Sequence, residues 1–82
     1  MDNIKSMINN VIMHKNKELL EKIAITVRTE RFKQKLSQDD LAELTGLSVN
    51  FISNVENAKQ DIRICNVKII AEALGKDLKD LF

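Results

Sequence analysis

The chain has 82 residues, of which 44% are hydrophobic and 30% charged, with two glycines and no proline. A chain of this length forms one small domain with a thin core, and its composition favours helices over a β-sandwich or barrel. Thirteen basic and twelve acidic residues give a net charge of +1, which indicates no particular class of partner.

Cys65 is the only cysteine, which excludes an internal disulfide and a cysteine-based zinc site. We expect it to be a buried or half-buried thiol. The lone His14 has no partners at metal-ligand spacing, and phosphate-loop and serine-nucleophile motifs are missing, so we expect neither a cofactor nor an enzyme. A membrane-length apolar run and a signal-peptide pattern are also missing, so we expect a cytoplasmic protein without membrane contact.

The first predicted element is a short amphipathic helix within an N-terminal extension over residues 1–17. Its apolar stripe consists of Ile4, Met7, Ile8, Val11 and Ile12. The stripe either packs on its own domain, pairs with the same helix of a second chain, or receives a partner protein.

The second predicted helix runs from about Glu18 to Gln34. Its buried face contains Leu19, Leu20, Ile23, Ala24 and Val27. A short helix follows, for which Ser37 is the N-cap and Asp40 the capping-box acid. We expect this helix to end at Thr45, because Gly46 adopts a left-handed conformation at little cost.

Three further segments complete the predicted domain over residues 18–82. Ser48 begins a helix whose inward side holds Ile52 and Val55, and a polar loop over residues 58–63 follows it. The next helix has Gly75 as its stop, and Asp77 caps a last turn or two. The inward positions of the helix that stops at Gly75 are Ile64, Val67, Ile70, Ala71 and Leu74. We therefore expect an all-α fold of five helices behind the N-terminal extension.

The segment 38–57 has the pattern of a helix-turn-helix, in which two short helices meet at a sharp turn. Gly46 is the turn, and Ala42 is small where the second helix crosses closely. Apolar residues fill the wedge between the two helices at Leu41, Leu47, Ile52 and Val55.

These residues resemble the lambda-repressor and Cro-like (XRE-type) family of helix-turn-helix regulators. The resemblance covers about residues 20–82. It rests on residues 36–42 (LSQDDLA), 46–48 (GLS), 51–57 (FISNVEN), 70–75 (IAEALG) and 80–82 (DLF).

The resemblance implies a regulator that binds duplex DNA, probes the major groove with the helix over residues 48–57, and acts as a dimer on a two-fold site. The implied base-reading residues are Val49, Asn50, Ser53 and Asn54. Because asparagine pairs with adenine and valine contacts the thymine methyl, we expect an A/T-containing half-site. The implied phosphate contacts are Gln38, Ser48, Asn57 and Lys59, and Arg63 is a further candidate for a phosphate contact.

The resemblance also implies a structural ion pair between Arg31 and Glu56, which ties the first helix of the domain to the reading helix. The chain departs from the family where Lys35 and Ala58 stand in place of frequent glycines, so strain or different capping is expected there. Arg63 stands where a helix-capping serine is common, and it is free to reach a phosphate or the minor groove instead.

The charge pattern opposes this interpretation in part. Residues 36–58 hold four acids and no base, whereas DNA affinity depends on neutralised phosphates. Two alternatives therefore stay open: an antitoxin that binds its toxin through the N-terminal helix, and a protein-interaction module without DNA binding. Cys65 and Ile69 lie off the inward face of their helix, so they are candidates for a subunit contact.

Overall fold

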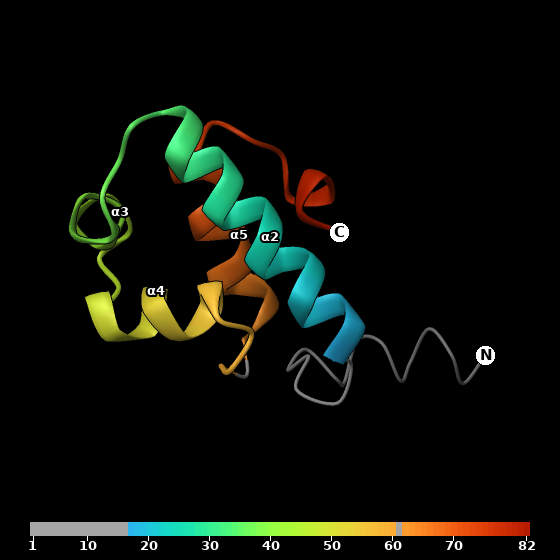
Figure 1. Ribbon diagram of the computed structural model, residues 1–82. Coiled ribbons are helices and arrows are strands. Elements are labelled where there is room, and N and C mark those ends of the chain that lie inside the picture. Colours follow the sequence, from blue (N-terminus) through green and yellow to red (C-terminus); the bar gives the residue numbers. More distant parts are fainter. Residues whose placement is uncertain (1–16, 61) are drawn as a thin grey trace.

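The computed structural model describes residues 17–60 and 62–82, which form an all-helical domain (Figure 1). The elements are α2 (Lys17–Lys33), α3 (Gln38–Thr45), α4 (Val49–Glu56), α5 (Ile64–Ala73) and the 3-10 helix η1 (Leu78–Leu81). The all-α class and the order of the helices are confirmed. The predicted extension lies outside the described residues apart from Lys17, which begins α2.

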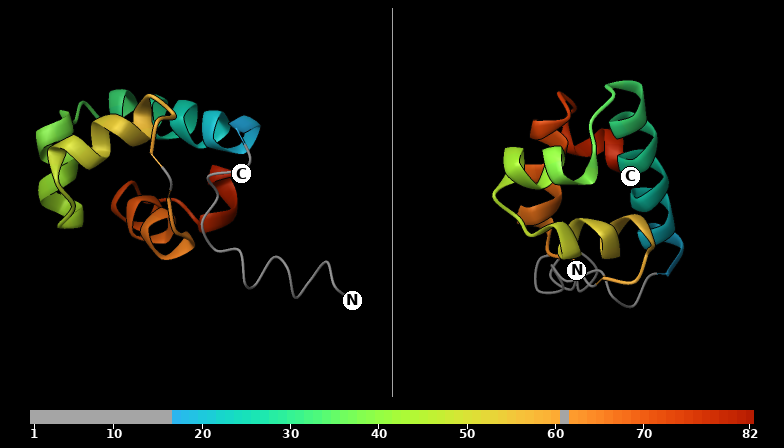
Figure 2. Two further views of the ribbon diagram at one scale, coloured as in Figure 1. Left: turned by 90° about the horizontal axis from the view of Figure 1, so that it is seen from below. Right: turned by 60° about the vertical axis from the view of Figure 1, so that its left-hand side comes forward.

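The helices enclose one apolar core. Seen from below, α2 and α4 run on one side of the domain, and α5 with η1 lies on the other (Figure 2). Side chains from all five elements and from the loop before α5 fill the space between them. The largest fully buried apolar side chains are Ile23, Val27, Leu41, Ile52, Ile62, Val67, Ile70 and Leu81. The core thus holds α4 at the surface, against α2 on one side and α3 on the other.

The helix-turn-helix forms through the local signals that its sequence contains. The Ser37 hydroxyl accepts from the Asp40 N–H at 2.9 Å, and the Asp40 carboxylate accepts from the Ser37 N–H at 2.9 Å. Gly46 ends α3 in the left-handed region at φ +76°. Ser48 then caps α4, because its hydroxyl accepts from the Phe51 N–H at 3.0 Å. The predicted capping box and the turn at Gly46 are confirmed, and Ser48 stands at the start of the second helix as expected.

The expected fifth α-helix is a 3-10 helix, so the described residues contain four α-helices and not five. The backbone hydrogen bonds of η1 join residues three positions apart: the Asp80 N–H donates to the Asp77 carbonyl, and the Phe82 N–H donates to the Lys79 carbonyl. The Asp80 carboxylate also accepts from the Asp77 N–H at 3.0 Å, which favours this tight turn. Leu81 is thereby turned into the core.

Two side chains differ in burial from the sequence-based expectation. Ile62 lies in the loop predicted to be polar, yet it is only 1% exposed and closes the core ahead of α5. Cys65 is exposed and is not a buried thiol. Side chains two residues apart on an α-helix point in directions that differ by about 200° around the helix axis. Because Val67 is buried, Cys65 therefore points outward.

Two helices end on residues other than glycine in the left-handed region. Lys35 follows α2 at φ +58°, and Ala58 follows α4 at φ +57°. Each turn is closed by the bond typical of a Schellman motif, from the Leu36 N–H to the Arg31 carbonyl and from the Lys59 N–H to the Asn54 carbonyl. The strain expected where the family often has glycine is therefore present at both sites.

Candidate nucleic-acid interface

The outer side of α4 presents the four residues predicted to read bases. Val49 and Asn50 are exposed, and Ser53 and Asn54 are half-buried. None of the described residues forms a hydrogen bond to the side-chain amide of Asn50 or Asn54. The opposite side of the helix is buried through Ile52 and Val55. The structure thus brings the predicted readers together on one face that solvent reaches.

The predicted phosphate contacts flank this face at both ends of the motif. Gln38 begins α3 and Ser48 caps α4, whereas Asn57 and Lys59 follow the C-terminus of α4. Two of their amides already have intramolecular partners: Gln38 Nε2 donates to Glu56 Oε1 at 3.0 Å, and Asn57 Nδ2 donates to the Ser53 carbonyl at 2.9 Å. Because each amide nitrogen carries two protons, one donor is left at each for a phosphate.

Arg63 lies apart from α4, at the N-cap of α5. Its backbone is extended, with φ −86° and ψ 151°, and its side chain forms no capping hydrogen bond. The side chain is exposed. The position therefore lacks the cap that the family's serine provides, and the guanidinium is left directed to solvent.

The ion pair implied by the resemblance is present and buried. Arg31 Nε lies 2.6 Å from Glu56 Oε2, and Arg31 Nη2 lies 2.8 Å from Glu56 Oε1. Burial by itself raises the pKa of the Glu56 carboxyl, but the hydrogen bonds from Arg31 and Gln38 and the nearby positive charges outweigh it and lower that pKa. The same hydrogen bond raises the pKa of Arg31. The pair is therefore charged at neutral pH and joins α2 to the end of α4.

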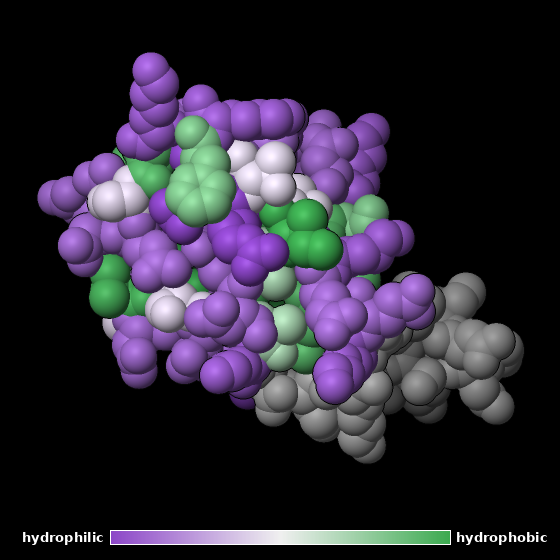
Figure 3. All heavy atoms as spheres, in the orientation of Figure 1, coloured by the Kyte–Doolittle hydropathy of each residue, from purple (hydrophilic) through white to green (hydrophobic). Residues whose placement is uncertain are grey.

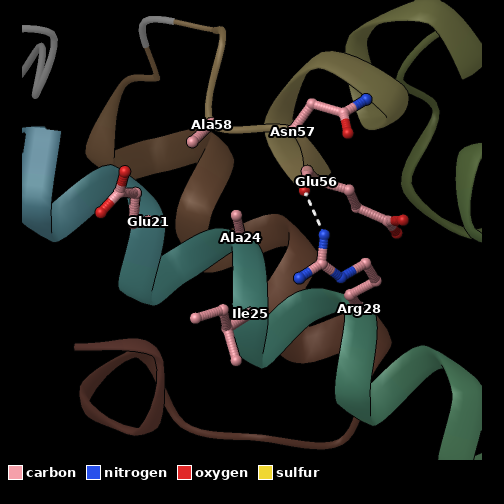
Figure 4. Close-up of a pocket in the computed structure, with 7 residues that line it drawn as sticks. All are labelled: Glu21, Ala24, Ile25, Arg28, Glu56, Asn57 and Ala58. Atoms are coloured by element: carbon pink, nitrogen blue, oxygen red, sulfur yellow. Dashed lines mark hydrogen bonds between the residues drawn. The ribbon is translucent and has the colours of Figure 1, made fainter.

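Sequence reasoning missed a second arginine at this junction. Arg28 Nη1 donates to the backbone carbonyl of Glu56 at 3.1 Å. Figure 4 shows the Arg28 side chain reaching from α2 to the end of α4, beside a groove of about 280 Å³. The other residues along the groove are Glu21, Ala24, Ile25, Asn57 and Ala58. The one sequence feature that indicates a role for Arg28 is its spacing of three residues from Arg31, because this spacing puts both arginines on one face of α2.

The charges around the candidate interface are unevenly distributed. Asp39, Asp40 and Glu43 are exposed on α3, whereas Arg28 and Lys59 are exposed at the C-terminal end of α4 and Arg63 is exposed at the start of α5. Much of the described surface in Figure 3 is hydrophilic, and the apolar side chains form small separate groups on that face. Positive charge is therefore available beside the exposed face of α4, at the end that carries Asn57 and Lys59. No helix in the described ranges is long and apolar enough to cross a membrane.

Comparison with known proteins identifies relatives of the whole domain. The control protein C.SmaI of Serratia marcescens is 33% identical over 64 residues, which are 78% of this chain and 76% of that protein. The crystal structure of the restriction-modification controller protein C.AhdI from Aeromonas hydrophila matches with a TM-score of 0.74 and 32% identity, over 77% of this chain and 96% of that one. A hypothetical transcription factor from Neisseria, NHTF, matches with a TM-score of 0.76 and 30% identity, over 80% and 77% of the two chains.

The family assignment follows from a match over most of the described domain. The model of the helix-turn-helix family HTH_3 matches residues 27–81, which include α3, the turn at Gly46, α4, α5 and η1. The buried pair between Arg31 and Glu56 also lies within the matched residues. The chain belongs to the helix-turn-helix family HTH_3 of DNA-binding transcription regulators.

Proposed function

We propose that this protein is a sequence-specific regulator of the controller or repressor type, which acts as a dimer on a two-fold-symmetric operator. In this proposal α4 enters the major groove with Val49, Asn50, Ser53 and Asn54 towards the base edges. The phosphate contacts come from Gln38, Ser48, Asn57, Lys59 and Arg63. Two protomers then read half-sites about one helical turn apart.

The observation that carries the proposal is the amphipathic arrangement of α4. Its apolar side is buried between α2 and α3, and its exposed side consists mostly of short polar residues. Short asparagine and serine side chains let the helix backbone approach the groove floor while they donate and accept hydrogen bonds. The controller proteins among the relatives support a regulator of the same kind.

A dimer is supported by apolar side chains that this protomer leaves in solvent. Ile69 on α5 is 38% exposed and Phe82 after η1 is 40% exposed. Cys65 lies one helical turn before Ile69 and is also exposed. A symmetric contact through α5 and the end of η1 would bury these groups and put two copies of α4 on one side of the duplex.

A second function has one observation in its favour. The exposed carboxylates of Asp39, Asp40 and Glu43 on α3 oppose the approach of a phosphate backbone, which is expected of a protein-interaction module that does not bind DNA. The two functions differ in salt dependence. DNA affinity falls steeply with salt concentration, with a slope that counts phosphate contacts, whereas contact with a protein groove is far less sensitive.

Selection of bound duplexes from a random DNA pool at moderate salt tests the proposal. We expect enrichment of a two-fold-symmetric site with A/T pairs in each half. Sedimentation of the protein with and without this site then gives the number of protomers bound. If the folded protein enriches no sequence, the DNA-binding proposal is wrong and the interaction module takes its place.

A further inference from the structure

The last carbonyl of α4 has its partner outside its own segment. An α-helix leaves its last four carbonyls without intrahelical partners. Three of the four in α4 accept from the backbone that follows: Ser53 from Asn57 at 3.1 Å, Asn54 from Lys59 at 2.8 Å and Val55 from Ala58 at 3.1 Å. The fourth carbonyl, that of Glu56, accepts from Arg28 on α2.

Arg28 also supplies charge that α4 lacks. The last turn of α4 contains no basic residue, although the C-terminus of a helix carries partial negative charge. The guanidinium of Arg28 lies at this end of the helix, 3.1 Å from the last carbonyl. The cap therefore combines a charge-assisted hydrogen bond with a favourable interaction with the helix dipole.

Glu56 is held at its backbone and its side chain by residues of two other helices. Arg28 bonds its carbonyl, and Arg31, one turn further along α2, bonds its carboxylate twice. Gln38 at the start of α3 donates to the same carboxylate. Glu56 consequently links the two ends of the motif that carry phosphate contacts in the proposed function, Gln38 on one side and residues 57–59 on the other.

We propose that Arg28 is a positioning residue for DNA recognition. By capping α4 through the Glu56 carbonyl, it holds the turn at residues 57–59 at a fixed distance from Gln38, so that both ends meet the phosphate backbone together. This inference rests on the proposed function. Arg28 itself contacts no phosphate in this account, and its effect reaches the DNA through Gln38, Asn57 and Lys59.

The test uses the full-length chain and the duplex selected above. Arg28→Met retains most of the aliphatic stem and removes the donor, and Lys22→Met removes one charge from an exposed position on the same helix as a control. We expect Arg28→Met to weaken operator binding roughly tenfold with no change in the salt slope. Lys59→Met, which removes a predicted phosphate contact, should lower that slope by about one. Lys22→Met should change affinity far less than Arg28→Met.

A double-mutant cycle separates positioning from a general loss of stability. All variants are measured at a temperature at which circular dichroism shows them fully folded. We expect Arg28→Met and Gln38→Ala to weaken binding less in combination than the sum of their separate effects, because each disrupts the same alignment. Additive effects would overturn the proposal. A fall in salt slope for Arg28→Met would also overturn it, since Arg28 would then be a direct phosphate contact.

Hydrogen exchange without DNA gives an independent readout. Arg28→Met should speed exchange of the Lys59 amide, which closes the turn after α4, and Arg28→Lys should restore part of its protection. Unchanged Lys59 exchange and unchanged affinity would show that Arg28 does not position the turn. If the wild-type protein selects no duplex, the proposed function fails and so does the link to DNA, whereas Lys59 exchange still decides whether Arg28 caps α4.

Discussion

Arg31 and Glu56 form a two-pronged ion pair inside the domain, with nitrogen–oxygen distances of 2.6 and 2.8 Å. The two residues are 7% and 2% exposed, and Arg31 also donates to the Leu36 carbonyl at 2.8 Å. The Phe32 ring centroid lies 4.5 Å from the guanidinium carbon of Arg31. These contacts connect α2 to the loop before α3 and to the end of α4, so one arginine aligns three segments.

Breaking the ion pair between Arg31 and Glu56 should lower the stability of the domain. Glu56→Gln leaves the Arg31 guanidinium buried without its counter-charge, so we expect the free energy of unfolding to fall by about 3 kcal/mol. Urea unfolding at pH 7 measures the loss. Lys33→Met is the control, because it breaks an exposed pair with Glu30 that is worth less than about 1 kcal/mol. A loss no larger for Glu56→Gln than for Lys33→Met would contradict the prediction.

The same pair predicts how stability depends on pH. The pKa of Glu56 in the folded protein lies below its ordinary value of about 4.3. Its stabilising contribution is therefore complete above that ordinary value and is lost as the pH falls through the folded pKa. In urea unfolding between about pH 6 and pH 3, the difference between wild type and Glu56→Gln should shrink towards the acid end. A difference that grows towards low pH would show that the pKa is raised.

Glycine at the two strained helix ends should stabilise the protein. Lys35 and Ala58 have positive φ, which costs a residue with a Cβ about 1–2 kcal/mol. We expect Lys35→Gly and Ala58→Gly each to add about 0.5–1 kcal/mol after the entropy cost of glycine. Gly46→Ala is the matched reverse change, since its φ is +76° and no heavy atom beyond Gly46 and its two chain neighbours lies within 4 Å of an added Cβ. Gly46→Ala should destabilise the protein through backbone strain alone. Thermal unfolding of the three variants checks the direction of each change in stability.

Arg63 offers a change with opposite effects on stability and on DNA affinity. Arg63→Ser supplies the missing side-chain cap of α5 and should add about 1 kcal/mol to the free energy of unfolding. If Arg63 contacts a phosphate, the same substitution should lower the salt slope of operator binding by about one. Arg63→Ala separates the effects, because it removes the charge without supplying a cap. Equal stability for the serine and alanine variants would rule out the capping effect.

The two asparagines of α4 should determine base preference. Asn50→Ala and Asn54→Ala should each cost about 1–3 kcal/mol of operator binding and relax the preference at one position of each half-site. Repeated duplex selection with each variant measures this relaxation. Gln38→Ala is the contrasting change, because loss of a phosphate contact weakens binding to all sequences alike. Unchanged site preference for both asparagine variants would refute the assignment of base readers.

Much of the domain could be predicted because its signals are local. The capping box at Ser37 and Asp40, the left-handed Gly46 and the cap at Ser48 each involve residues within one to four positions of one another. Helical spacing likewise predicted the buried faces of α2 and α4. The ion pair between Arg31 and Glu56 came from the family resemblance, since nothing in the spacing of two residues 25 apart indicates that they meet.

The tertiary structure alone decided which distant side chains complete the C-terminal ends of α4 and α5. Arg28 bonds the Glu56 carbonyl across 28 residues, and Gln34 donates to the Leu74 carbonyl across 40 residues at 2.7 Å. The tertiary structure also buries Ile62 in the core, although Ile62 lies in a loop whose sequence predicts a polar segment. The amino-acid sequence determines helix starts, stops and faces, because backbone conformation responds to near neighbours. Which carbonyl meets which guanidinium depends on how the helices pack, and only the folded domain sets that distance.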